Sequence, residues 1–182
     1  MAEEKKEVKQ EEKEEKARSA PKKKTAAKKP DPQKLNQDLL AAARQGNTSK
    51  VNSLLKQGAD AEQKFALIWA AQAGHEKVVQ ALLEAGADAN IQADGGTHAL
   101  ELAAQNGHLA TAETLIEAGA DVNLEAIDGW TPLMKAAAQG HQQLVQTLLE
   151  AGADITHRNN SGKTALDYAQ PAIAATLQAA LA

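Results

Sequence analysis

Apolar residues in the C-terminal five-sixths of the chain recur every three or four positions, which is the spacing of amphipathic helices. In residues 128–154, Leu133, Ala136 and Ala137 share one helical face, and four aliphatic residues between positions 144 and 149 share a second. Each predicted helix has only about ten residues, too few to persist alone in water. The pattern therefore predicts helix pairs that need neighbours for stability.

Polar capping residues, proline and glycine set the ends of these predicted helices. Thr131 is a good N-cap residue, and Pro132 suits the first helical position because its missing N–H costs nothing there. Gly140 ends the first helix, and Gly152 supplies the left-handed conformation that ends the second. Asp154 then favours a turn by bonding nearby backbone N–H groups.

The same helix endings recur along the chain. "EAGAD" occurs three times, and Gly-Ala-Asp stops end at Asp60, Asp88, Asp121 and Asp154, the last two intervals being equal. Gly-His pairs at 74–75, 107–108 and 140–141 keep the same interval. A helix pair repeated at this period, each too small to fold alone, predicts a solenoid of stacked units.

These units resemble the ankyrin repeat, which has a period of about 33 residues and the signature T-P-L-H-x-A. The resemblance implies an all-α, ankyrin-type helical solenoid of about five repeats with short β-hairpin loops. The expected units one to five are residues 35–60, 61–88, 89–121, 122–154 and 155–182. Only unit four keeps Thr-Pro, and the signature histidine is replaced by Ile68, Glu101, Met134 and Asp167.

Units two and five depart from the period. The interval from Asp60 to Asp88 is shorter than the later ones by five residues, which are missing at the expected hairpin tip, so the row of hairpins should lack its second member. In unit five, Pro171 interrupts the chain, and Ile173, Leu177 and Leu181 form a narrow apolar stripe. This stripe predicts a C-terminal capping helix.

Charge separates the first part of the chain from the rest. Residues 1–30 hold 11 Lys+Arg and 7 Glu, a net charge of +4, whereas residues 31–182 hold 9 Lys+Arg and 17 Asp+Glu, a net charge of −8. Residues 1–34 are expected to be a disordered, charged tail, because such a segment buries too little apolar surface to offset its ordering entropy. The chain shows no secretory signal and no apolar run long enough to span a membrane, so we expect a cytoplasmic protein, or a nuclear one in a eukaryote. We also expect it to be a monomer on its own.

The residues give no support for catalysis or metal binding. There is no cysteine, which excludes disulfides, thiolate metal sites and a cysteine nucleophile. Stacked units lie too far apart for His75, His108 and His141 to share a zinc ion, so these histidines are expected to bond their own helical turns. His98 and His157 are expected to be solvated or partner-contacting hairpin residues. We expect no enzyme activity, no cofactor and no metal.

The resemblance implies that binding uses the hairpin tips and the concave face of the inner helices. One column of that face, with one member in each of units two to five, holds Trp69, Leu102, Lys135 and Tyr168. Trp69 and Trp130 are hypothesised to flank a binding groove, the alternative being that Trp69 packs beneath neighbouring hairpins. The candidate partner-binding residues are Trp69, Gln72, Gln92, Asp94, Thr97, His98, Leu102, Gln105, Asn106, Glu125, Ile127, Asp128, Trp130, Lys135, Gln139, Arg158 and Lys163.

The expected function is therefore protein–protein interaction, as an adaptor, scaffold or stoichiometric regulator. The net charge of residues 31–182 favours a basic partner, because charge complementarity accelerates association. An alternative is association with nucleic acid or an anionic surface through the tail residues Lys22, Lys23, Lys24, Lys28 and Lys29, which would give salt-sensitive binding. A simply solvated tail is a third interpretation.

Overall fold

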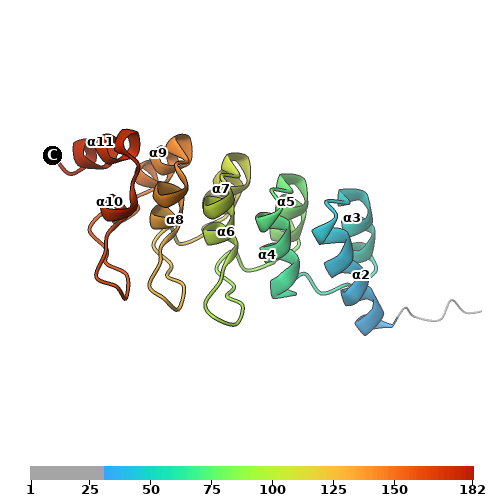
Figure 1. The fold of residues 1–182 in the computed structure, drawn as a ribbon. Helices are drawn as coiled ribbons and strands as arrows, with labels where there is room; N and C mark the ends of the chain where they lie inside the picture. The colour runs from blue at the N-terminus through green and yellow to red at the C-terminus, as the bar shows by residue number, and fades with distance from the viewer. Residues whose placement is uncertain (1–30) are drawn as a thin grey trace, which may run out of the picture.

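The computed structural model describes residues 31–182, in which ten helices are arranged as five antiparallel pairs in a single row (Figure 1). The first helices of the pairs, called the inner helices here, are α2 (Pro32–Arg44), α4 (Lys64–Gln72), α6 (Ala99–Asn106), α8 (Pro132–Gln139) and α10 (Ala165–Tyr168). The outer helices are α3 (Thr48–Lys56), α5 (Glu76–Glu84), α7 (Leu109–Glu117), α9 (Gln142–Glu150) and α11 (Pro171–Ala180). The predicted all-α solenoid is confirmed.

The helix ends follow the capping residues seen in the sequence. Thr131 accepts a hydrogen bond from the backbone N–H of Met134 at 3.4 Å, and Pro132 opens α8. Gly140 ends α8 with a φ of 85°, a left-handed conformation in which a side chain would be strained. Local chemistry thus sets both ends of α8 before any packing is considered.

The first helix begins earlier than expected. Asp31 caps α2 by accepting the backbone N–H of Gln33 at 3.0 Å, and Pro32 takes the first helical position. The prediction of a disordered tail reaching residue 34 is therefore wrong for residues 31–34, because Asp-Pro starts a helix as well as Thr-Pro does. The five tail lysines, Lys22, Lys23, Lys24, Lys28 and Lys29, lie outside the described residues.

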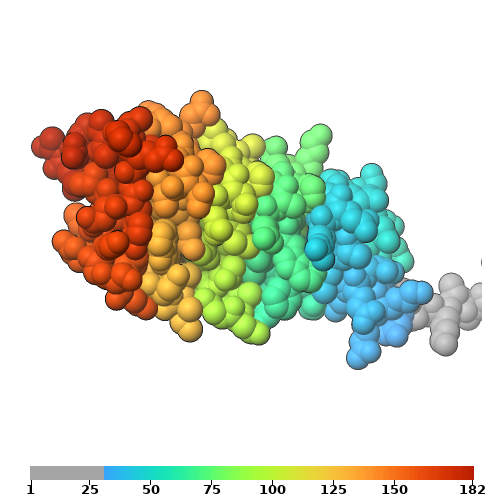
Figure 2. All heavy atoms as spheres, viewed as in Figure 1, coloured from blue at the N-terminus to red at the C-terminus, as the bar shows by residue number. Residues whose placement is uncertain are grey.

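The core is a continuous column of leucines and alanines. Leu39, Leu67, Leu100 and Leu133 occupy the same position on successive inner helices, and each is at most 1% exposed. Burying such a side chain contributes about 1.5–3 kcal/mol, and each inner helix packs against the inner helices of the adjacent units. Alanine pairs beside them let the helices approach closely, and the units form slabs in direct contact (Figure 2). Stability is therefore shared between neighbours, as expected for a solenoid.

Asparagine side chains join successive turns that follow the outer helices. Asn123 accepts the backbone N–H of Asp154 at 2.8 Å and donates to the Gly152 carbonyl at 3.3 Å. Asn90 makes the equivalent bonds one unit earlier. Glu62 stands at this position in unit two, and within residues 31–182 no equivalent bond reaches the backbone N–H of Asp88.

The last helix closes the core as a cap. Ile173 and Leu177 of α11 are buried, as the apolar stripe predicted. Leu181 is 52% exposed, so its predicted place in the stripe is wrong. The reason is that α11 ends at Ala180 and Leu181 follows it as the C-cap residue. Among the described residues, no helix has the length and apolar character needed to cross a membrane.

Candidate partner-binding face

The inner helices present one column of side chains on the face opposite the core. Trp69, Leu102, Lys135 and Tyr168 recur at equal intervals along the chain, and all four are half-buried. We use the name inner face for this column together with the aromatic and cationic residues beside it, which are Arg44, Lys64, Phe65, Trp130 and Lys163. Trp and Tyr are enriched among the residues that contribute most of the binding energy at protein interfaces.

The inner face carries a first aromatic cluster on α4. The rings of Phe65 and Trp69 are stacked, with centroids 5.4 Å apart. The guanidinium of Arg44 lies 5.9 Å from the Trp69 ring, and the ammonium of Lys64 lies 5.3 Å from the Phe65 ring. Each ring therefore has a cation beside it, an arrangement contributing about 0.5–1 kcal/mol at exposed sites.

A second aromatic cluster joins units four and five. Trp130 and Tyr168 have ring centroids 4.4 Å apart, the Lys135 ammonium lies 4.7 Å from the Trp130 ring, and Lys163 lies 5.3 Å from the Tyr168 ring. The Tyr168 hydroxyl accepts a hydrogen bond from Asn159 Nδ2 at 2.8 Å. Trp130 was expected at the tip of a hairpin, but its half-buried ring packs against the core and these neighbours instead.

The ammonium of Lys135 is engaged within the molecule. It lies 3.2 Å from Glu101 Oε1, and the two side chains are 20% and 5% exposed. Burial raises the pKa of Glu101, and the contacts with Lys135 oppose that rise. Glu101 Oε2 has no hydrogen-bond partner among the described residues. Sequence reasoning missed this buried pair, although Glu101 occupies the position of the family's signature histidine.

His98 is not available to a partner. Its side chain is 1% exposed, so the expectation of a solvated or partner-contacting residue is wrong. His98 is the N-cap of α6: Nδ1 accepts the backbone N–H of Glu101 at 3.4 Å, and Nε2 lies 3.0 Å from the Leu124 carbonyl. Burial lowers its pKa to about 4, against the opposing effect of the Leu124 hydrogen bond. His98 thus takes the role that Thr131 has in the next unit.

The other histidines join neighbouring units. His75, His108 and His141 were expected to bond their own helical turns, but each Nε2 lies 3.0–3.2 Å from a carbonyl in the preceding unit, that of Arg44, Gln72 or Gln105. That expectation is wrong because each ring lies over the positive-φ glycine at the end of the inner helix of the preceding unit, which is Gly46, Gly74 or Gly107. His157 also bonds a neighbouring unit, at the Gly129 carbonyl.

The three hairpins have the same backbone geometry. The N–H groups of Ala93, Ala126 and Asn159 bond the carbonyls of residues 97, 130 and 163, and a positive-φ glycine follows at positions 96, 129 and 162. Consecutive tips are bonded to one another. Ile127 N–H donates to the Gly95 carbonyl at 3.1 Å, and Asn160 N–H donates to the Asp128 carbonyl at 3.1 Å.

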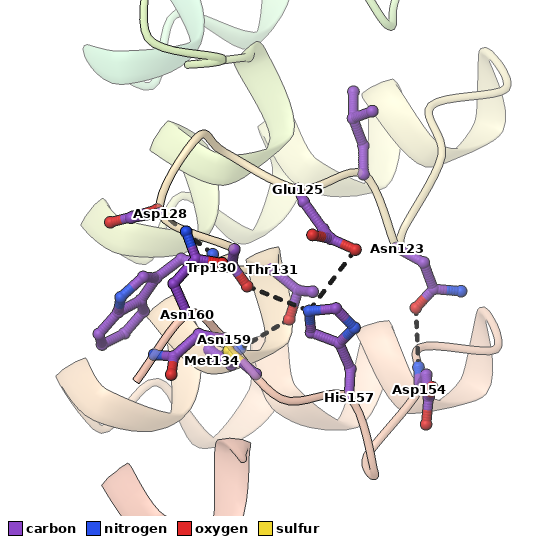
Figure 3. Close-up of polar contacts among 12 residues, drawn as sticks. Asn123, Glu125, Asp128, Trp130, Thr131, Met134, Asp154, His157, Asn159 and Asn160 are labelled. Atoms are coloured by element: carbon purple, nitrogen blue, oxygen red, sulfur yellow. Dashed lines mark hydrogen bonds and ion pairs between the residues drawn. The ribbon is translucent and has the colours of Figure 1, made fainter. Parts of the chain in front are cut away.

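Side chains strengthen these contacts between tips. Figure 3 shows the joint between units four and five, where His157 lies 3.6 Å from Glu125 and Asn160 lies beside the unit-four tip. Gln92 Nε2 donates to the Glu125 carbonyl at 3.0 Å, so its amide is also used within the molecule. The tips therefore form one connected edge rather than separate loops.

The tips and the helix ends provide the exposed part of the candidate set. Asp94 is 97% exposed at its side chain, and Ile127 is 78% exposed. Thr97 and Gln105 are half-buried, and the remaining exposed candidates are Gln72, Gln92, Asn106, Glu125, Asp128, Gln139, Arg158 and Lys163. Candidate residues at the tips and at the ends of the inner helices are thus exposed, whereas His98 is not.

Two further features concern metal binding and a second possible binding surface. Among residues 31–182, no group of three or more His, Asp or Glu side chains is placed to hold a metal ion. A shallow hollow of about 580 Å³ lies on the opposite side, between α5 and α7, and is lined by residues such as Glu76, Glu84 and Glu117. Sequence reasoning missed this acidic hollow because its residues come from two different units.

Comparison with known proteins agrees with the geometry. A family model described as "Ankyrin repeats (3 copies)" matches residues 39–126 and 100–177, which together span about three quarters of the chain. A search of curated proteins returns no match.

Proposed function

The chain belongs to the ankyrin repeat family, and from this premise we propose that it acts as an adaptor, scaffold or stoichiometric regulator that binds a partner protein through its inner face and hairpin tips. Ankyrin repeats are in general protein–protein interaction modules. The observation that carries the proposal is the pair of half-buried aromatic clusters, around Trp69 and around Trp130, each of which adjoins a hairpin tip. Lys64 of the first cluster contacts Asp94 of the unit-three tip, and Trp130 directly follows the unit-four tip.

Aromatic side chains with adjacent cations are frequent anchors of protein interfaces. Each cluster offers ring surface beside an exposed cation, Arg44 in the first and Lys163 in the second, so a partner can bury apolar area and also pair with the cation. The exposed Asp94, Glu125 and Asp128 at the tips, with a net charge of −8 over residues 31–182, support a basic partner. Such complementarity would act mainly on the association rate.

Affinity capture with purified variants tests this proposal. We expect Trp69→Ala and Trp130→Ala each to weaken partner binding by at least tenfold, while circular dichroism shows an intact helical fold. Leu149→Ala, at a half-buried position on the outer helix α9, is the matched control and should leave affinity within about twofold. Unchanged affinity in both tryptophan variants would refute binding through the inner face.

The basic tail supports a second candidate function, association with nucleic acid or an anionic surface. Ala17–Lys29 carries six positive and no negative charges. Deleting residues 1–30 separates the two functions, because tail-mediated binding should disappear with the deletion and should weaken steeply with salt. Binding to the inner face should survive the deletion and depend less on salt.

A further inference from the structure

The connected edge of hairpin tips is incomplete at its N-terminal end. Hairpins lie below α6, α8 and α10, whereas the chain enters α4 directly without one (Figure 1). We call the vacant place the open hairpin position. It lies between the first turn of α2 and the tip of unit three, and the lower outline of the molecule is recessed there (Figure 2). Unit two is five residues short for this reason.

A backbone donor is left free at this position. Ile127 and Asn160 each donate their N–H to the preceding tip, and Asp94 is their equivalent in unit three. Within residues 31–182 no hydrogen bond uses the Asp94 N–H. The same hydrogen bond thus occurs twice, from Ile127 N–H to the Gly95 carbonyl and from Asn160 N–H to the Asp128 carbonyl. An equivalent bond from the Asp94 N–H would need a backbone carbonyl at the open hairpin position.

The side chain of Asp94 favours a positively charged group on whatever binds at the open hairpin position. At the equivalent position, Asn160 Nδ2 reaches back to the Ile127 carbonyl of the preceding tip at 3.0 Å. Asp94 carries a carboxylate there, which can only accept hydrogen bonds. Its Oδ1 lies 3.1 Å from Lys64 Nζ in an exposed pair, and exposed pairs of this kind are weak and easily exchanged.

From these contacts we propose that the open hairpin position binds a tight, glycine-containing turn of a partner protein that carries a lysine or arginine. The partner's turn carbonyl accepts the Asp94 N–H, and its cation pairs with the Asp94 carboxylate. This is recognition by strand-like backbone pairing with side-chain specificity. The inference rests on the proposed function and names the partner's chemistry at one end of the same surface.

Two other occupants fit the position less well. The chain's own basic segment, residues 17–29, contains no glycine, whereas all three existing tips use one with a φ of 72–74°. A second copy of the chain could offer the unit-five tip, but that tip is bonded to unit four through Asn160. The other repeats of that second copy would then collide with the first turn of α2, which borders the open hairpin position on the side away from unit three (Figure 1).

The experiment uses a probe with the required chemistry. A cyclised peptide with the sequence of residues 157–164, HRNNSGKT, carries Arg158 and Lys163 and a turn glycine. Added to isotopically labelled full-length protein, it should shift the NMR signal of the Asp94 amide and approach saturation at millimolar concentration. The amides of Ile127 and Asn160 should move little, because they are already bonded.

Two controls define the contact. A peptide with both cations replaced by glutamate should bind at least fivefold more weakly. A variant with a copy of Gln92–Gly96 inserted after Gln63, which restores the missing hairpin, should not bind the peptide, while its circular dichroism shows an intact fold.

Three results would overturn the proposal: no shift of the Asp94 amide up to about 5 mM peptide, unchanged binding by the insertion variant, or tighter binding of a peptide comprising residues 17–29. If the peptide does not bind but the tryptophan variants do weaken partner binding, only the proposal for the open hairpin position is rejected. Failure of the tryptophan variants would reject the proposed binding through the inner face.

Discussion

Protonation of His98 provides the sharpest test of the packing between units three and four. The neutral ring donates from Nε2 to the Leu124 carbonyl and accepts the Glu101 N–H at Nδ1. A proton on Nδ1 would replace that acceptor with a donor facing another donor, inside a site that is 1% exposed. The folded state therefore resists protonation, in keeping with a pKa lowered mainly by burial to about 4.

The direction and size of the effect follow from linkage. The ordinary histidine pKa is 6.5, so between pH 6.5 and pH 4 the unfolded chain binds a proton that the folded chain does not. Stability is thus fully present above pH 6.5 and falls as the pH is lowered through this window. A shift of about 2.5 pKa units corresponds to about 3 kcal/mol of unfolding free energy lost by pH 4.

Urea unfolding of the wild type and His98→Thr at pH 7.5 and pH 4.5 measures this loss. Threonine caps the equivalent helix in unit four, so the variant keeps an N-cap but has no group that titrates in the window. The wild type should lose about 2–3 kcal/mol more than the variant between the two pH values. Equal losses would refute the reasoning, since His98 would then not be buried in its neutral form. The raised pKa of Glu101 favours folding at low pH, but it is common to both proteins and cancels in the comparison.

Two further substitutions test contacts between units. Lys135→Met removes the cation 3.2 Å from Glu101 and should cost about 3 kcal/mol at pH 7, because an uncompensated carboxylate stays buried. The cost should shrink as the pH is lowered, because burial raises the pKa of Glu101 and protonation removes the uncompensated charge; a pH-independent loss in urea unfolding would contradict the account. Glu62→Asn should add about 1 kcal/mol of stability by accepting the Asp88 N–H, as Asn90 does for the next unit; a lower unfolding midpoint would show that unit two cannot adopt that geometry.

Much of the fold was predictable because its determinants are local. Thr131, Pro132 and Gly140 set the ends of α8 through their own backbone chemistry, and these signals recur at a fixed interval. The missing hairpin of unit two could also be predicted, because five absent residues leave no chain to form it. The start of α2 was misjudged since Asp31 and Pro32 lie beside a highly charged segment that masked their capping pattern.

The candidate site was less predictable because burial depends on contacts between units. His98 lies in register with Thr131, which was the available signal for a capping role, yet its hairpin position suggested exposure. The place of Trp130 against Tyr168 depends on the next unit and could not be read from one repeat. The pairing of Glu101 with Lys135 likewise joins residues of two consecutive units, on neighbouring helices.

The central claim is that a partner binds the side formed by the inner face and hairpin tips. Amide hydrogen exchange of the protein alone and in complex with its captured partner tests this directly, because exchange reports which backbone segments become protected. We predict added protection at the tips around Asp94 and Asp128 and in α4 and α8. Protection confined to the outer helices, around the acidic hollow between α5 and α7, would contradict the account.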